Sequence, residues 1–162
     1  MSSQEHRLYC TWTVWAIRAE EEFILDDVVE ISTVEEFWRF HKSLPSIKTI
    51  QQRAMIAYFK KGVTPAYERC NKLRYILRTE RNPFDDDSGP KEWEQILMKL
   101  VGGELELGVP DMKNKILGLF ASFDPQAGRC WKLWLSGSIN EQTKRILEEK
   151  IGEPLTLEKF RR

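Results

Sequence analysis

The chain of 162 residues carries 25 Lys and Arg residues and 25 Asp and Glu residues, so its formal net charge is zero. With 41% hydrophobic and 31% charged residues, its composition is that of a globular protein rather than a disordered chain, and its length predicts one domain over residues 1–162. The balanced charge argues against binding to DNA or RNA through bulk electrostatics. Six Trp, eight Phe and four Tyr are the unusual feature, because small proteins seldom need so many large rings.

Neither a membrane span nor a signal peptide is expected. No run of about 18 apolar residues is present, and residues 1–5 are polar. Cys10, Cys70 and Cys130 are far apart and form no CxxC pair, so neither a zinc site nor a disulfide framework is predicted. These features favour a cytoplasmic, or also nuclear, protein with reduced thiols.

The first half of the chain alternates strands with one helix. Aromatic and β-branched residues predict four strands, at residues 8–17, 23–31, 55–59 and 73–79. Between the second and third strands, Ser32 and Glu35 have the spacing of a capping box. They predict a short amphipathic helix that ends near Pro45.

The second half continues with two helices and three strands. A helix is predicted from Pro90, an acceptable first residue, to Gly102, which stops it. Ser138 and Glu141 form a second possible capping box for a helix that ends at Gly152. Apolar runs predict the remaining strands, at residues 116–123, 130–135 and 155–160.

The resulting order, β-β-α-β-β-α-β-β-α-β, predicts an α+β fold in which helices are interspersed with antiparallel hairpins. Three helices on one face of a curved sheet would bury that face and leave the other available. Charge is uneven along the chain, since residues 60–81 are rich in Lys and Arg and residues 20–36 are acidic. Such a basic edge suits a small anionic ligand, although charged runs are more often solvated surface.

Four sequence blocks carry a family resemblance. They are Thr11–Trp15, Ser32–Trp38, Phe59–Glu68 and Trp93–Gly102, the last followed by Trp131–Trp134. In order and spacing, over roughly residues 6–157, they resemble the eukaryotic translation initiation factor 4E family, which binds the 7-methylguanosine cap of mRNA. The resemblance implies a curved antiparallel β-sheet with three helices packed on its convex face. It also implies cap binding without catalysis or a cofactor, and recruitment of a scaffold protein of initiation factor 4G type.

The chemistry of the cap explains why such residues are needed. Methylation at N7 makes guanine cationic, and a cation prefers an aromatic face. By resemblance, Tyr67 is one stacking ring, in place of the family's usual Trp, and Glu68 accepts the N–H groups of the guanine edge. Trp134 corresponds to the Trp near the methyl group, and Arg74 to an Arg on the phosphate side.

Three further cap-site positions depart from the family pattern. Phe23 is the only aromatic residue near the expected first stacking Trp, and it serves either as that ring or as a strand core residue. Arg129 and Lys132 are the basic residues nearest the remaining phosphate contacts, where they either bind phosphate or solvate a turn. The family's Lys on that strand aligns with Cys130.

A partner-binding surface is implied on the first two helices. Val34 and Trp38 would receive a partner helix that carries a Tyr-x-x-x-x-Leu-apolar motif, whether from the scaffold or from a regulatory protein. His6, Met98 and Val101 would extend this groove. Other Trp residues are expected in the core: Trp12, Trp15, Trp93 and Trp131.

No catalytic or metal-binding motif emerges. The chain has no P-loop, GxSxG or HExxH pattern, and only two His residues. The main hypothesis is therefore a divergent cap-binding protein in translation initiation. Two alternatives stay open: a cap-binding translational repressor, and a protein-interaction module that has lost the cap site.

Overall fold

A computed structural model describes residues 6–19, 23–43, 54–66, 70–79, 89–124 and 128–161. Within these ranges the elements follow the predicted order. They are β1 (Arg7–Ala19), β2 (Phe23–Thr33), α1 (Val34–Ser43), β3 (Ala54–Lys60), β4 (Tyr75–Thr79), α2 (Gly89–Val101), β5 (Ile116–Asp124), β6 (Gly128–Leu135), α3 (Glu141–Ile151) and β7 (Leu155–Lys159).

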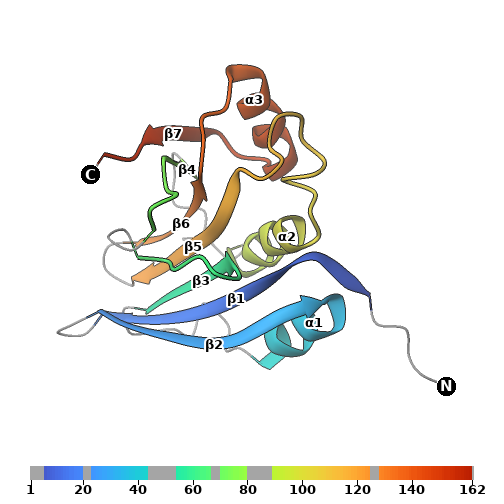
Figure 1. The fold of residues 1–162 in the computed structure, drawn as a ribbon, viewed down its shortest axis with the longest axis vertical. Helices are drawn as coiled ribbons and strands as arrows, with labels where there is room; N and C mark the ends of the chain where they lie inside the picture. Colours follow the sequence, from blue (N-terminus) through green and yellow to red (C-terminus); the bar gives the residue numbers. More distant parts are fainter. Residues whose placement is uncertain are drawn as a thin grey trace.

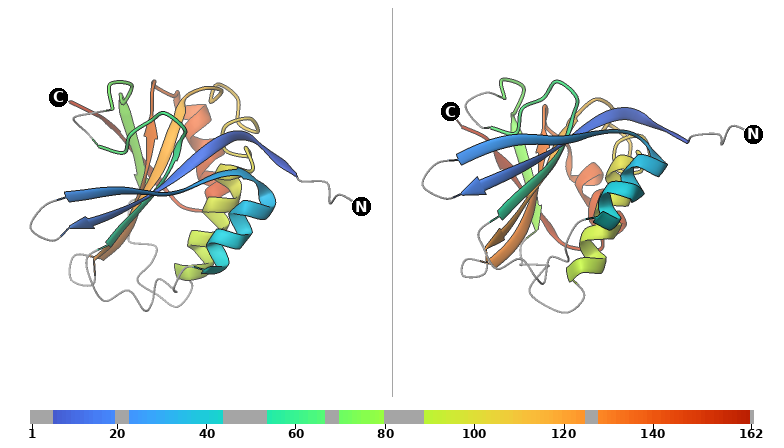
Figure 2. Two further views of the ribbon diagram at one scale, coloured as in Figure 1. Left: turned by 60° about the horizontal axis from the view of Figure 1, so that its bottom comes forward. Right: turned by 90° about the horizontal axis from the view of Figure 1, so that it is seen from below.

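The strands form one sheet in the order β2-β1-β3-β5-β6-β4-β7, and every neighbouring pair is antiparallel (Figure 1). The sheet is curved, and all three helices lie on one side of it (Figure 2). The predicted fold class is therefore confirmed.

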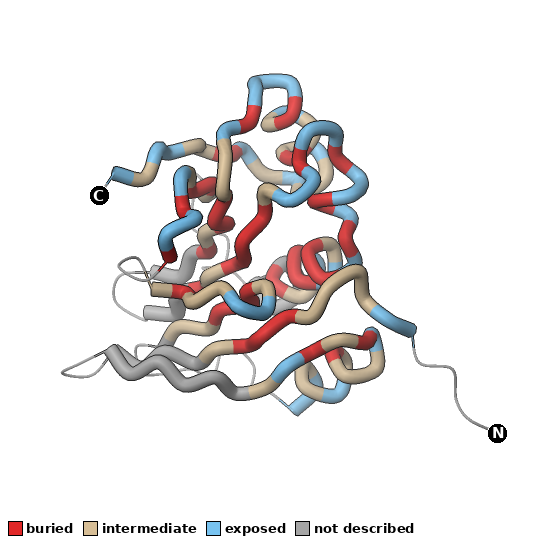
Figure 3. The backbone as a smooth tube through the Cα atoms, in the orientation of Figure 1, coloured by how far each residue is buried: buried red, intermediate tan, exposed pale blue. Residues whose placement is uncertain are grey.

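The two faces of the sheet have separate apolar clusters. The larger one, on the helix face, joins strand residues such as Trp12 and Trp131 to Phe37 of α1, Trp93 of α2 and Leu147 of α3. The smaller one, called here the open-face cluster, contains no helix residue and consists of Ala57, Phe59, Cys70, Leu73, Ile76, Leu117 and Trp134. Buried stretches accordingly follow the central strands and the sheet-facing sides of the helices (Figure 3).

Both predicted capping boxes are displaced. Helix α1 is capped by Thr33, whose Oγ1 accepts from the backbone N–H of Glu36 (3.1 Å), while Glu36 Oε1 accepts from the Thr33 hydroxyl (3.2 Å). Helix α3 is capped by Asn140, whose Oδ1 accepts from the N–H of Thr143 (2.8 Å). The prediction of Ser32 and Ser138 as caps was wrong, because each precedes a second good capping residue that lies closer to the first helical turn.

Gly118 on β5 makes room for the aromatic part of the open-face cluster. A Cβ atom at this position would lie 2.4 Å from the Phe59 ring and 2.8 Å from the Phe59 Cα atom, so strand β3 itself would have to move. We expect Gly118→Ala to lower the free energy of unfolding by about 1–3 kcal/mol, the usual cost of overpacking. Urea denaturation measures this change. Gly137→Ala is the matched control, because its nearest neighbour is the Lys115 side chain at 3.8 Å; equal stability of the two variants would contradict the packing argument.

One ion pair is largely buried between β3 and the segment after α2. Glu106 is 2% exposed, and its carboxylate accepts from Lys60 Nζ at 2.5 and 2.9 Å and from the N–H of Ile116 at 3.2 Å. The Tyr9 ring lies 5.9 Å from Lys60 Nζ. Burial and the nearby Glu106 carboxylate raise the pKa of Tyr9, so its hydroxyl stays neutral. Through the Lys60–Glu106 pair, the end of β3 is therefore fixed to the segment that follows α2.

Candidate functional site

Trp134 lies on the open face, as predicted, but it is not exposed there. Its relative exposure is 0%. Phe59 and Trp134 meet edge to face (ring centroids 5.0 Å apart, planes at 82°), and Phe120 stacks on Trp134 (6.1 Å, 20°). Trp134 therefore does not expose its own ring in this structure, and Phe120, which is half-buried, is the more exposed ring of the stack. The role of Trp134 near the methyl group stays a prediction.

Lys132 belongs to the same face, two residues before Trp134 on β6. It is half-buried and pairs in register with Phe120 on β5 and Arg78 on β4. Arg78 in turn donates from Nε to Glu158 Oε1 of β7 at 2.7 Å. Lys132 thus borders the half-buried Phe120 ring, and Arg78 lies one strand farther away.

Arg74 lies at the end of this surface. Its backbone N–H donates to the carbonyl of Leu135, the residue after Trp134, at 2.9 Å. Its side chain is exposed, and Nη1 donates to the carbonyls of Asn71 (2.7 Å) and Leu73 (3.1 Å). The guanidinium therefore holds the turn before β4, while Nε and Nη2 take no part in these bonds.

The remaining predicted cap residues are only partly covered by the structure. Tyr67 and Glu68 lie outside the described residues. The residues that flank them are anchored on the open face, since Cys70 is buried in the open-face cluster and its N–H donates to the Ala66 carbonyl at 2.9 Å. Phe23 begins β2 and Arg129 lies in β6, but their side chains are outside the described part.

Most residues predicted to bind a partner helix lie on α1 and α2, which are side by side (Figure 2). Val34 of α1 and Met98 of α2 are 37% and 45% exposed, and Trp38 is half-buried. Val101 was predicted to extend the groove, but it is only 3% exposed and belongs to the helix-face core. Val101 packs in the core between α2 and the sheet, so it lies beneath the predicted partner surface and not on it.

His6 is fixed next to α1. Its Nδ1 lies 2.6 Å from Glu35 Oε1, its backbone N–H also donates to Glu35, and its carbonyl accepts from the N–H of Val34 at 2.8 Å. The hydrogen bond with the His6 side chain is the main cause that lowers the pKa of Glu35 to about 2. The Glu35 carboxylate therefore remains charged at neutral and mildly acidic pH, and His6 is held beside the first turn of α1.

Glu94 places a carboxylate on the partner surface one turn before Met98. Its Oε2 lies 3.8 Å from His41 Nε2, and the His41 ring stacks on Phe37 (centroids 5.6 Å apart) and meets Trp38 edge to face (5.9 Å). The pair connects α2 to α1 beside the Trp38 ring.

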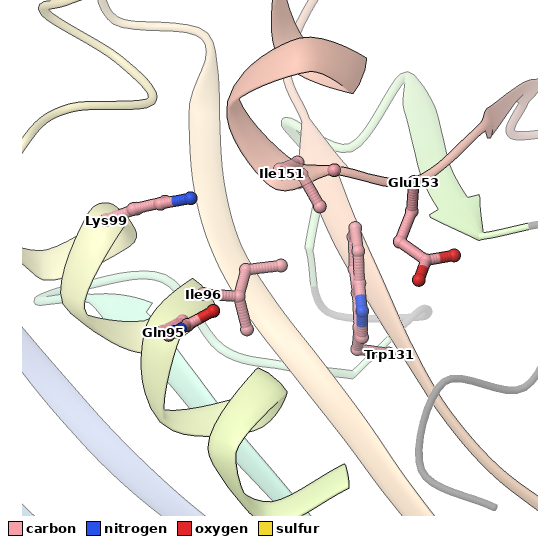
Figure 4. A pocket seen from close by; sticks show the side chains of 7 residues that line it. Gln95, Ile96, Lys99, Trp131, Ile151 and Glu153 are labelled. Atoms are coloured by element: carbon pink, nitrogen blue, oxygen red, sulfur yellow. The ribbon is translucent and has the colours of Figure 1, made fainter. Parts of the chain in front are cut away.

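A separate small cavity lies on the helix side, away from both surfaces. Its volume is about 140 Å³, and it lies between α2 and the C-terminal end of α3 against the ring of Trp131 (Figure 4). Lys99 borders it and donates from Nζ to the carbonyl of Lys150, which closes one wall. None of the predicted cap residues lines this cavity.

The described ranges contain neither a membrane-spanning helix nor a metal-binding cluster. In this part of the chain no helix has the length and apolarity needed to cross a membrane. The same ranges contain no cluster of three or more His, Cys, Asp or Glu side chains placed to hold a metal ion.

Comparison with known proteins identifies the family. The sequence profile described as "Eukaryotic initiation factor 4E" matches residues 7–161. The chain belongs to this family. Among its relatives, the Arabidopsis thaliana "Eukaryotic translation initiation factor isoform 4E" is 28% identical over 163 residues, which cover 94% of this chain and 78% of the relative. The Candida albicans "Eukaryotic translation initiation factor 4E" is 24% identical over 164 residues, which cover 89% and 74%.

Solved structures of the initiation factor 4E family share the fold. Ascaris suum eIF4E-3 in complex with m7G cap superimposes with a TM-score of 0.81 at 22% identity, over 98% of this chain and 93% of that one. Caenorhabditis elegans eIF4E-3 in complex with the 4E-binding protein Mextli and a cap analogue gives 0.76 at 22% identity, over 96% and 92%.

Two features of the open face were not predicted from the sequence. They are the half-buried Phe120 ring that stacks on Trp134, and Arg78 as the neighbour of Lys132. A pattern in the sequence could have found the first. Phe120 and Lys132 are each four residues from the ends of the β5–β6 turn at Asp124 and Gly128, so a regular hairpin pairs them.

Proposed function

We propose that this protein binds the 7-methylguanosine cap of mRNA on the open face of its sheet and binds a scaffold or regulatory protein through α1 and α2, and so acts in translation initiation. Membership of the initiation factor 4E family carries this proposal. The protein acts by binding and not by catalysis.

The open face supports the first half of the proposal. Its aromatic stack ends in the half-buried Phe120, and Lys132 lies beside this ring. The backbone of Arg74 bonds to Leu135, the last residue of β6. Tyr67 and Glu68 supply the stacking ring and the acceptor for the guanine edge. The cationic N7-methylguanine is then recognised by aromatic faces and one carboxylate, and its phosphates by local basic residues.

The relatives of known structure support the second half. Schistosome eIF4E has been solved with m7GpppA and 4E-BP, and the Caenorhabditis elegans protein with Mextli. In this chain, the exposed Val34 and Met98 and the half-buried Trp38 provide an apolar surface of the kind that receives an amphipathic helix.

Fluorescence titration tests cap binding, because Trp15 and Trp134 both pack on the open face. We expect 7-methyl-GTP to quench the intrinsic Trp fluorescence at far lower concentration than GTP. Glu68→Gln should weaken 7-methyl-GTP binding by about tenfold or more, since hydrogen bonds to a charged group contribute about 1.5–3 kcal/mol. Glu94→Gln, on the opposite side of the sheet, is the matched control and should bind normally.

A second candidate function is a protein-interaction module without cap binding. The full burial of Trp134 favours it, since that ring is not open to a ligand. The same titration decides between the two: equal, weak quenching by 7-methyl-GTP and GTP at millimolar concentration would contradict cap binding and leave the interaction module.

A further inference from the structure

A single register row crosses the open face from β1 to β7. It consists of Trp15, Ala57, Phe120, Lys132, Arg78 and Thr156, each paired with the next across neighbouring strands. Directly paired residues of an antiparallel sheet point to the same side. Since Trp15 and Phe120 pack against the open-face cluster, the whole row points away from the helices.

The aromatic half of the row offers a stacking surface. Phe120 lies against Trp134 on one side, and its register neighbour on β3 is Ala57, whose small side chain leaves the ring partly exposed. Aromatic side chains of this kind stack nucleic acid bases with little regard to sequence, because every base has a π face.

The charged half of the row places like charges directly opposite one another. Lys132 and Arg78 are register partners, an arrangement that is unfavourable unless an anion offsets it. Glu158 offsets Arg78 through Nε and Nη2, at 2.7 and 2.6 Å, and Nη1 takes no part in this pair. Lys132 has no carboxylate partner among the described residues, so the row keeps a positive charge beside the Phe120 ring.

The row also lies close to the proposed cap site. Arg74 bonds to Leu135, which is three residues beyond Lys132 on β6, a separation of roughly 10 Å along a strand. A ligand whose phosphates reach Arg74 therefore continues over the row.

We propose that this row binds the nucleotide that follows the cap, with its base stacked on Phe120 and its phosphate held by Lys132 and by Nη1 of Arg78. The inference rests on the proposed cap binding and adds a second contact region for the RNA. It assigns to Phe120 and Arg78 a role in substrate recognition and extends that of Lys132.

The test compares 7-methyl-GTP with the capped dinucleotide m7GpppA. We expect the wild-type protein to bind the dinucleotide more tightly. Phe120→Leu keeps an apolar side chain against Trp134 but removes the aromatic face. It should weaken m7GpppA binding roughly fivefold to a hundredfold and 7-methyl-GTP binding much less, so that the advantage of the dinucleotide is lost.

The charge is tested separately with a short capped RNA. Lys132→Gln should reduce the slope of log affinity against log salt by about 0.7, as expected for one lost phosphate contact to a single strand. Lys144→Gln, on α3 and remote from the open face, is the matched control and should leave the slope unchanged. Thermal unfolding of each variant confirms that it is folded.

The outcomes separate the two proposals. If Phe120→Leu weakens both ligands equally, or if wild-type protein binds 7-methyl-GTP but gains nothing from the added nucleotide, the row is not a nucleotide site and cap binding stands. An unchanged salt slope in Lys132→Gln overturns the phosphate contact. If folded wild-type protein binds neither ligand with methyl selectivity, cap binding itself fails.

Discussion

Lys60→Met is expected to lower the free energy of unfolding by about 3–5 kcal/mol. The reason lies in Glu106, which is 2% exposed and receives two of its three hydrogen bonds from the Lys60 amino group. Methionine fills the space of the lysine stem but leaves a buried carboxylate without its counter-charge. Guanidinium or urea denaturation at neutral pH gives the value directly.

Two variants make this test specific. Lys61→Met removes a 64% exposed lysine whose pair with Glu30 spans 3.5 Å, and it should change stability by less than about 1 kcal/mol. The double variant Lys60→Met/Glu106→Gln should recover much of the loss, because a neutral amide oxygen can still accept from the N–H of Ile116. A Lys60→Met protein as stable as Lys61→Met would show that the ion pair contributes little.

Trp38→Ala is expected to weaken binding of a partner helix by about 30-fold or more, a loss of about 2 kcal/mol or more that is typical of an aromatic residue at the centre of an interface. Trp38 meets Phe37 edge to face at 5.2 Å and His41 at 5.9 Å, and its half-buried ring follows the exposed Val34 by one helical turn. Isothermal titration with a peptide that carries a Tyr-x-x-x-x-Leu-apolar motif measures the change.

The controls distinguish a lost contact from a damaged helix. Trp38→Phe keeps the aromatic packing and should retain much of the affinity, and Arg39→Ala, at an exposed position of the same helix, should bind normally. Because Trp38 is half-buried, thermal unfolding must first establish that Trp38→Ala remains folded. Unchanged peptide affinity in folded Trp38→Ala protein would place the partner site elsewhere.

The order and extent of the elements followed from the sequence because each has a local pattern. The alternation that separates Trp131 from Trp134 placed them on opposite faces of β6, as observed. The caps were misplaced by one or two residues, since Ser32 and Thr33, like Ser138 and Asn140, are competing candidates. Only the backbone geometry of the first turn decides between them.

The candidate site was harder to predict because it depends on contacts between distant segments. The burial of Trp134 results from Phe59 and Phe120 on two other strands, and no local pattern reveals it. Lys60 and Glu106 are 46 residues apart, so their pairing has no signature in the sequence. The residues taken from the family resemblance, Tyr67 and Glu68 above all, stay predictions, as does the cytoplasmic location.

Adjacent residues of strand β3 belong to the two apolar clusters that lie beneath the proposed binding surfaces. The Tyr58 ring meets Phe37 of α1 (6.4 Å) and Trp93 of α2 (6.2 Å), while the next side chain, Phe59, meets Trp134 on the other face (5.0 Å). We therefore expect a displacement of either helix that moved Tyr58 to shift Phe59 and the Trp134 ring that it contacts. The proposed cap and partner sites thus lie on opposite faces of the sheet, yet adjacent residues of one strand contribute to the packing beneath each of them.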